Sequence, residues 1–212
     1  MPTILPDRIR LPFTFDPVRL AYDLQGLASV DWIRHFVAQN YEGDWSVIPL
    51  RGTAGARHPV MMIYSDPNAT EFEDTPMLRC SPYFREVLGV FDCPLRTVRL
   101  MRLTPGSRIK EHTDLELSVE EGTARIHIPV TTNAEVEFYL NRSRVVLEAG
   151  TAWYLRLSDP HSVANEGSSD RVHMVIDAEV NDWLRGLLQA AALGEGRGAG
   201  LPEASQADIV AR

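Results

Sequence analysis

Two short motifs place metal-binding side chains in the second half of the chain. One is His112-Thr113-Asp114, and the other is His161 within Asp159-Pro160-His161. Residues two apart in an extended segment point to the same side, so His112 and Asp114 can converge on one ion. Two imidazoles and one carboxylate leave the other positions of an ion open, which suits an iron(II) that must also bind a chelating cosubstrate and dioxygen. Zinc fits the same ligands nearly as well, so ligand type alone leaves the metal open.

Each motif alone is weak, because both also occur by chance in surface turns. Arg171 strengthens the case: it opens a stretch of alternating residues and shares one face with His173, while apolar residues take the other. An arginine turned into a barrel needs an anion, because a buried unpaired guanidinium is costly. The distal carboxylate of a dicarboxylate would bind it through two hydrogen bonds. Alternatively, Arg171 pairs with Asp177 or Glu179, or lies exposed at the start of its strand.

The stretch 123–132 alternates in the same way, with Arg125 and His127 on the face opposite to an apolar one. If this polar face lines a barrel, Arg125 can bind a carboxylate of a cosubstrate or substrate, and His127 can donate a hydrogen bond to the cosubstrate. On alternation alone, a solvent-facing edge without function explains the pattern better.

The elements that must position these residues follow from the apolar pattern, whose period changes to two from Thr97 onward. Strands are predicted over residues 97–103, 123–132, 135–140, 145–148, 151–157 and 171–178. Many short strands without intervening helices favour a sandwich, barrel or jelly roll over a parallel sheet. We therefore expect a mainly β fold with flanking helices.

The residues before 97 have a largely helical pattern with loops between the helices. Asp16-Pro17 and Ser81-Pro82 each predict a helix start, and Asp31 is expected to cap a short helix that includes Phe36. Residues 45–50 are predicted to form a strand, and residues 65–80 a loop.

The length of 212 residues suits one domain with small helical additions. We expect this domain to cover residues 1–193. It divides into a helical lid region (1–96), a β core (97–180) and a C-terminal helix (181–193, starting at Asp182). Residues 194–212 are rich in Gly, Ala and small polar residues, which predicts a mobile tail.

Charge and composition limit the classes of partner. The formal net charge is -8, with 44% hydrophobic and 24% charged residues, as in ordinary globular proteins. Neither nucleic acid nor an anionic membrane surface is an expected partner, because both bind positive faces. No stretch approaches the roughly 18 apolar residues that a membrane helix needs. Cys80 and Cys93 lack the spacing of a zinc site or disulfide framework, and together with the absence of a signal peptide pattern they predict a cytoplasmic protein. The oligomeric state is left open.

Taken in order, the motifs between Trp45 and Asp177 resemble the aspartyl/asparaginyl β-hydroxylase family of 2-oxoglutarate dioxygenases. The matching pieces are Gly43-Asp44-Trp45-Ser46, Leu50-Arg51, His112-Thr113-Asp114, Arg125-Ile126-His127-Ile128-Pro129, Gly150 to Trp153, Pro160-His161-Ser162 with Asn165, and Arg171-Val172-His173. The resemblance implies a double-stranded β-helix (a jelly roll similar to the cupins) with flanking helices. An ordered set of this kind is far more specific than any single motif.

The resemblance also implies residue roles. His112 and His161 would bind iron(II), and Arg171 would hold the distal carboxylate of 2-oxoglutarate. Arg125 and His127 would lie near the 2-oxo acid end of that cosubstrate or near the substrate. The implied reaction consumes 2-oxoglutarate and dioxygen, releases succinate and carbon dioxide, and hydroxylates an unactivated C–H bond.

One departure bears on the substrate. The vertebrate enzymes that name the family have no acidic residue where Asp114 stands, so this chain is more similar to the bacterial amino-acid hydroxylases, including the proline hydroxylase branch. Arg51 matches a family position and is the candidate substrate-binding residue, together with Arg125. A cluster of arginines in an acidic protein suggests a small-molecule or peptide substrate with a carboxylate, although exposed arginines often simply pair with nearby Asp and Glu.

A second class of function uses the same metal ligands. A cupin-like isomerase or small-molecule binding protein would keep His112, Asp114 and His161 but would have no oxygenase activity. Arg171 and Arg125 discriminate between the two classes, because a protein without oxygenase activity does not need a dicarboxylate clamp.

Overall fold

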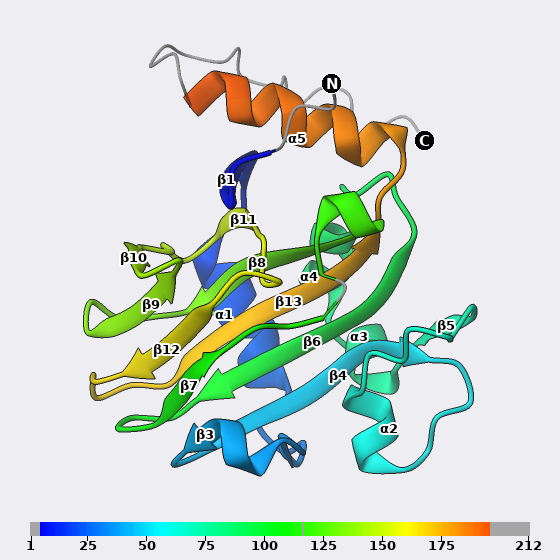
Figure 1. The fold of residues 1–212 in the computed structure, drawn as a ribbon. Coiled ribbons are helices and arrows are strands. Elements are labelled where there is room, and N and C mark those ends of the chain that lie inside the picture. The colour runs from blue at the N-terminus through cyan, green and yellow to red at the C-terminus, as the bar shows by residue number, and fades with distance from the viewer. Residues whose placement is uncertain (1–4, 116, 196–212) are drawn as a thin grey trace.

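Two antiparallel β-sheets face each other, and helices cover the outer face of the larger sheet (Figure 1). The computed structural model describes residues 5–115 and 117–195. Across the larger, eight-stranded sheet the order is β1 (Arg8–Thr14), β11 (Thr151–Leu155), β8 (Thr123–Thr131), β13 (Arg171–Glu179), β6 (Leu95–Leu103), β4 (Trp45–Thr53) and β2 (Ile33–Arg34), with β5 (Phe72–Asp74) on β4. The five-stranded sheet has the order β10 (Ser143–Val145), β9 (Val136–Leu140), β12 (His161–Asn165), β7 (Arg108–His112) and β3 (Tyr41–Glu42).

The two faces of the larger sheet bury different side chains. On β8, the apolar residues Ala124, Ile126 and Ile128 pack into the core beneath the helices, whereas Arg125 and His127 face the smaller sheet. A second apolar core lies between the sheets and is built from residues of both. The prediction of a mainly β fold with flanking helices is thus confirmed, and the arrangement is that of a double-stranded β-helix.

The helices are placed by local capping and by contacts with the outer face. They are α1 (Pro17–Gly26), α2 (Pro59–Ile63), α3 (Pro76–Arg79), α4 (Pro82–Leu88) and α5 (Asp182–Glu195), with 3-10 turns at Ala38–Asn40 and Val119–Glu121. As predicted, Asp16 caps α1, and its carboxylate accepts hydrogen bonds from two backbone amides of the first turn. The carboxylate of Asp23 in α1 accepts from the amide of Phe84 in α4 at 2.9 Å, which ties the two helices together.

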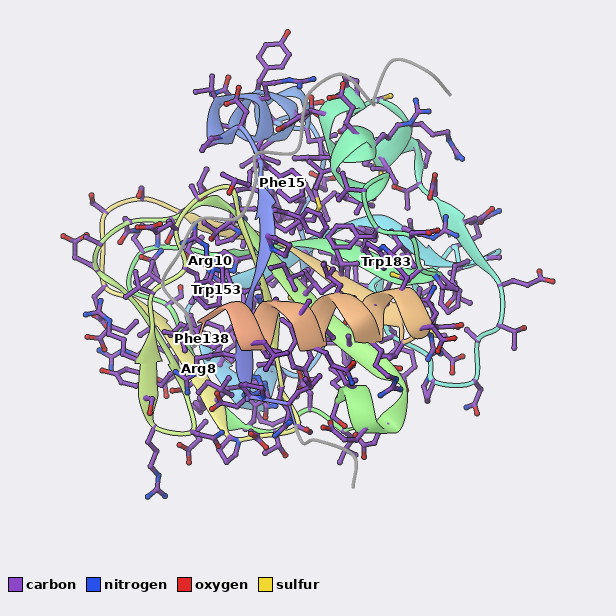
Figure 2. All side chains as sticks on the ribbon, turned by 90° about the horizontal axis from the view of Figure 1, so that it is seen from above. Arg8, Arg10, Phe15, Phe138, Trp153 and Trp183 are labelled. Carbon is purple, nitrogen blue, oxygen red and sulfur yellow. The ribbon has the colours of Figure 1, made fainter. Side chains whose placement is uncertain are left out.

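The last helix closes one end of the sheet. Figure 2 shows α5, which carries Trp183, lying across β1. Leu184 and Leu188 of α5 are completely buried in the outer core. The predicted start at Asp182 is confirmed, but the helix continues to Glu195, past the expected end at residue 193. The rest of the predicted tail, residues 196–212, lies outside the described part of the chain.

The expectation of a mainly helical region over residues 1–96 is wrong, because β1, β2 and β5 as well as the predicted β4 belong to the larger sheet. The short helix expected after Asp31 is instead β2, in which Ile33 pairs with Val47 of β4. The few apolar residues of this segment suit a helix or a strand, so its pairing with β4 decides that it is a strand. The predicted loop 65–80 contains β5 and α3, which Thr75 caps.

Some strands of the second half differ from their predicted bounds. Residues 145–148 were expected to be extended, but β10 ends at Val145. The tight turn at Asn141 and Arg142, both with positive φ, brings the chain back against β9 at once, so the strand already begins at Ser143. The strands β7 and β12 were not predicted, because short segments with mixed polarity give weak periodicity.

No helix in residues 5–115 and 117–195 is long and apolar enough to cross a membrane.

Gly150 provides a test of the packing between α1 and the larger sheet. It has a φ of +81°, and a Cβ at this position would lie 2.2 Å from the carbonyl oxygen of Phe15. Gly106 has a similar φ of +74° but open space around it. We expect Gly106→Ala to lower the free energy of unfolding by about 1–2 kcal/mol, the usual cost of a left-handed conformation. Gly150→Ala should lower the free energy of unfolding, measured with urea, clearly more than Gly106→Ala does. Equal losses in the two variants would contradict the close approach of Gly150 to the carbonyl oxygen of Phe15.

Candidate metal centre and anion site

A cavity of about 220 Å³ opens between the two sheets. Its lining includes the predicted residues His112, Asp114, His161, Arg125, His127 and Arg171. They come from both sheets and from the segment after β7, so the fold brings together side chains that are up to 59 positions apart in the sequence.

The three predicted metal ligands lie close together at one side of this cavity. His112 is the last residue of β7 and His161 the first of β12, and the two are paired across these neighbouring strands. Asp114 follows β7, and its backbone amide donates to the carbonyl of Leu157 at 2.8 Å. One ligand atom from each residue lies within 4.8 Å of the others. This spacing fits a single metal ion.

Backbone hydrogen bonds orient both histidine rings. The Nδ1 of His112 lies 2.7 Å from the carbonyl oxygen of Lys110, and that of His161 lies 3.0 Å from the carbonyl oxygen of Asp159. A carbonyl can only accept, so each Nδ1 carries a proton, and Nε2 is the nitrogen of each ring that could bind a metal. Burial lowers the pKa of His161 to about 4, although Asp114 opposes this shift, so the ring is neutral at physiological pH. The pair is therefore ready to bind a cation.

Arg125 holds the carboxylate of the third ligand. Its Nη1 donates to Oδ2 of Asp114 at 2.7 Å, while Oδ1 of the same carboxylate lies 3.7 Å from Nε2 of His112. The opposite side of the Arg125 guanidinium binds Asp177. Burial disfavours the charge of Arg125, but Asp177 and Asp114 outweigh it and hold its pKa above the usual range. One oxygen of Asp114 is thus fixed by Arg125, and the other is free to face a metal.

Arg171 is buried without a carboxylate to neutralise it. It is 2% exposed, and no Asp or Glu oxygen in the described part of the chain lies within salt-bridge distance of it. Its Nη2 donates to Nδ1 of His173 at 2.8 Å. Burial lowers the pKa of Arg171 to about 9, so the group is still charged at neutral pH. A buried cation of this kind calls for an anion from outside the chain.

Two buried histidines accompany this unpaired charge. The Nδ1 atoms of His127 and His173 lie 3.4 Å apart, and burial together with Arg171 lowers the pKa of both rings well below the usual value. Nε of Arg171 and Nε2 of both histidines are buried without a hydrogen-bond partner among the described residues. Neutral imidazoles and a guanidinium with unused N–H groups form a site that a carboxylate would satisfy.

Arg51, the predicted substrate-binding residue, does not line the cavity. Its Nη1 lies 2.5 Å from Oδ1 of Asp74, and its remaining donors bind the backbone carbonyls of Leu95 and Phe72. These contacts join β4, β5 and β6 at one edge of the larger sheet. The structure thus places Arg51 outside the cavity, with its guanidinium bound within the larger sheet.

Several cavity residues carry no strong sequence signal. His35 stacks on Trp45 with ring centroids 3.5 Å apart, and Phe36, Tyr64 and Ser65 continue this side of the cavity. Burial and the charge of Arg99 lower the pKa of His35 to about 3. Alternation along β6 predicts that only one of Arg99 and Arg102 points inward, and Arg99 is the one that does. His35 lies in an irregular segment, where periodicity gives no information.

The comparison with protein families shows to which family the chain belongs. The aspartyl/asparaginyl beta-hydroxylase family matches residues 23–180, which is 158 of the 212 residues. The chain belongs to this family. The matched range contains every strand that contributes to the cavity, together with the three metal-ligand candidates and Arg171.

The chain is also similar to individual proteins. A protein named L-proline cis-4-hydroxylase, from Rhizobium meliloti (strain 1021), is 27% identical over 177 residues, which is 82% of this chain. The matched region covers 61% of that protein's length. Among solved structures, the non-heme alpha ketoglutarate dependent epimerase SnoN from nogalamycin biosynthesis has a TM-score of 0.52 at 10% identity, covering 82% of this chain and 78% of that one. A Pseudomonas putida prolyl-4-hydroxylase has a TM-score of 0.49 at 8% identity, over 82% and 93% of the two chains. The SnoN likeness shows the fold alone.

The low pKa of His35 gives a pH test of the cavity. Below an unfolded-state pKa of about 6.5, the unfolded chain binds a proton at His35 that the folded chain does not, so stability falls as the pH falls. We expect the free energy of unfolding of the metal-free protein, measured with urea, to fall between pH 6.5 and 5.5 by about 1 kcal/mol less in His35→Gln than in the wild type. If both lose the same amount, His35 takes up its proton in the folded state as well.

Proposed function

We propose that this chain is an iron(II)- and 2-oxoglutarate-dependent dioxygenase that hydroxylates an amino acid or an amino-acid side chain. The observation that carries the proposal is the shared cavity: a set of two histidines and one aspartate lies in the same 220 Å³ space as Arg171, a buried guanidinium for which the described residues offer no carboxylate partner. Metal ligands alone would suit many functions. A metal site next to an unpaired buried cation suits a dicarboxylate cosubstrate.

The donor set fits the metal that the family implies. His112 and His161 would bind through Nε2 and Asp114 through one carboxylate oxygen, which leaves the remaining positions of an octahedral ion open. Zinc suits the same donors, so the ligands alone do not select iron. Membership of the β-hydroxylase family is what favours iron. Bound iron, 2-oxoglutarate and dioxygen would supply oxidative decarboxylation to succinate and carbon dioxide, coupled to hydroxylation of the substrate.

For the cosubstrate, we assign the distal carboxylate to Arg171, with His127 beside it in the cavity. Nε of Arg171 has an unused N–H group in a buried setting, and a carboxylate would satisfy it. Arg125 lies at the metal end and would border the 2-oxo acid group while it holds Asp114. The side chains of this chain would bind, orient and exclude water, whereas the oxidation itself belongs to the metal and cosubstrate.

The charges inside the cavity favour a substrate with a carboxylate. Three buried guanidiniums, those of Arg99, Arg125 and Arg171, face two carboxylates, those of Asp114 and Asp177. A divalent metal ion and a dianionic cosubstrate cancel, so one positive charge is left for a substrate anion. Arg99 lies on the side of the cavity that contains His35 and Ser65, and we propose it in place of Arg51 as the substrate-binding residue. The relative that acts on L-proline, by its name, supports a small amino acid.

Three further proposals complete the assignment. Residues 5–195 form one dioxygenase domain, because the helices of the first half pack on the sheet that carries the site. Cys80 and Cys93 are free, which supports a reducing, cytoplasmic environment. No observation favours an isomerase or a simple binding protein, which has no need of Arg171 as a dicarboxylate clamp.

Asp114 tests the metal ligands. In anaerobic titrations, the wild type should bind iron(II) and, with 2-oxoglutarate added, should show a weak visible charge-transfer band. Asp114→Ala should weaken or abolish both, because it removes the only carboxylate of the proposed set. Asp159→Asn, which changes a nearby carboxylate bonded to Asn141, is the matched control and should behave as the wild type. Full iron binding by Asp114→Ala would refute the metal assignment.

Arg171 tests the cosubstrate site separately. Arg171→Ala should raise the 2-oxoglutarate concentration needed for half-maximal succinate release about 30-fold, as for the loss of ~2 kcal/mol of charged hydrogen bonding, and should leave iron binding largely intact. Arg51→Ala removes a guanidinium outside the cavity and should leave that concentration unchanged. If iron binding collapses in Arg171→Ala, the role of Arg171 is structural. A mass-spectrometric screen of amino acids and peptides for a gain of one oxygen would identify the substrate.

A further inference from the structure

One carboxylate on the inner face of the larger sheet collects an unusual number of donors. Asp177 accepts hydrogen bonds from Nε and Nη2 of Arg125 at 2.6 and 2.9 Å and from Nη2 of Arg99 at 2.5 Å. The hydroxyls of Thr97 and Ser65 also donate to it, at 2.7 and 2.6 Å. Asp177 is 2% exposed. Asp177 is not a candidate metal ligand, and the proposed reaction gives it no direct role.

The register of the sheet explains how this cluster forms. β13 lies between β8 and β6, and Asp177 is paired directly with Arg125 on β8. On the other side, the pairing with β6 is irregular between Ile176 and Ala178, which flank Asp177. Thr97 and Arg99 are two apart on β6 and point to the same inner face. Three neighbouring strands therefore direct their polar side chains to a single point.

Electrostatics makes Asp177 the residue that holds the cluster together. Arg99 and Arg125 are both buried, and without a shared carboxylate their like charges would repel each other. Burial alone would raise the pKa of Asp177, but Arg125 and Arg99 hold it well below the usual range. The carboxylate is therefore always charged under working conditions, and it fixes both guanidiniums in place.

The cluster extends from Asp177 to the metal-ligand candidate. Arg125 uses Nε and Nη2 for Asp177 and Nη1 for Oδ2 of Asp114. Asp114 lies beyond the end of β7 in an irregular segment, and its side chain is 27% exposed. Its contacts with the two histidines are longer, at 3.7 and 3.9 Å. The hydrogen bond from Arg125 is thus the closest constraint on the direction of the Asp114 carboxylate.

A second branch of the cluster reaches the side of the cavity formed by Tyr64 and Ser65. Ser65 follows α2 and lines the cavity, and its hydroxyl donates to Asp177 and lies 2.9 Å from that of Thr97. Ile63, at the end of α2, accepts a hydrogen bond from Arg99 through its carbonyl at 3.0 Å. The segment after α2 is therefore fixed to the same carboxylate that orients the metal-ligand candidate.

We propose that Asp177 is a positioning residue, which acts through Arg125 to direct the Asp114 carboxylate toward the metal and through Ser65 to fix the adjacent side of the cavity. The inference rests on the proposed function only in taking Asp114 as a metal ligand. Hydrogen bonds from neighbouring residues to a ligand commonly change metal affinity 10- to 100-fold, which sets the expected size of the effect.

The test measures the affinity of cobalt(II) alone by titration calorimetry, so that no turnover is needed. Asp177→Asn should bind cobalt(II) at least 10-fold more weakly than the wild type, and its ligand-field absorption should change as the Asp114 carboxylate reorients. Asp74→Asn is the matched control, because it removes a carboxylate from Arg51 on the same sheet outside the cavity. The control should keep the wild-type affinity and spectrum.

A double-mutant cycle separates positioning from general support of the fold. If Asp177 acts through Arg125, then Asp177→Asn should have little further effect on cobalt(II) affinity in an Arg125→Met background. An equal loss in both backgrounds, or no loss in the single variant, would overturn the proposal. Ser65→Ala should leave cobalt(II) affinity unchanged, and a loss of affinity in this variant would contradict the separation of the two branches.

Three further outcomes are distinguishable. If Asp177→Asn does not fold, as judged by thermal unfolding, Asp177→Glu keeps the charge but moves the carboxylate by one methylene, and wild-type affinity and spectrum in that variant would overturn the proposal. If the wild type binds no cobalt(II), or Asp114→Ala binds it equally well, the proposed metal site fails, and the Asp177 inference fails with it. Loss of binding in Asp114→Ala but not in Asp177→Asn refutes the positioning role alone.

Discussion

Charge buried inside a β-sheet structure is the constraint on which this protein depends. The inner face of the larger sheet carries three guanidiniums, and water cannot neutralise them at 2–8% exposure. Arg99 and Arg125 are neutralised by Asp177 and Asp114, whereas Arg171 has no such carboxylate among the described residues. The internal ion pairs hold two of the guanidiniums in place, and the third would favour an anion in the cavity. Stability and recognition thus draw on the same few side chains.

The alternation of polar and apolar residues predicts much of this arrangement. Along β8 it separates Arg125 and His127 from the apolar residues that pack beneath the helices, and along β13 it places Arg171 and His173 on the same inner face. Each of these strands is apolar on one face and polar on the other. Because the apolar face must be buried under the helices, the sequence also predicts a layered β fold. The convergence of His112, Asp114 and His161 follows from their ligand types and from the resemblance of the whole ordered set.

Other features of the site depend on pairing between strands far apart in the sequence, which the alternation of polar and apolar residues does not reveal. Arg51 matches a family position, but its neighbours in space, Asp74 and the carbonyls of Leu95 and Phe72, are set by how β5 and β6 meet β4. His35 reaches the cavity only because its segment folds back over Trp45. The role of Asp177 as a shared acceptor for donors from two neighbouring strands and Ser65 likewise becomes visible only once the strand order is known.

The division of labour between the two sheets has an evolutionary consequence. Both histidines of the candidate metal centre belong to the smaller sheet, where they are paired across β7 and β12. Arg99 and Arg171, the residues proposed to bind anions, belong to the larger sheet, which faces it across the cavity. A mutation that exchanges one inward side chain of the larger sheet can therefore alter which anion is accepted without moving either imidazole. Such a scaffold allows new specificities to arise stepwise, while the reactive centre is inherited unchanged.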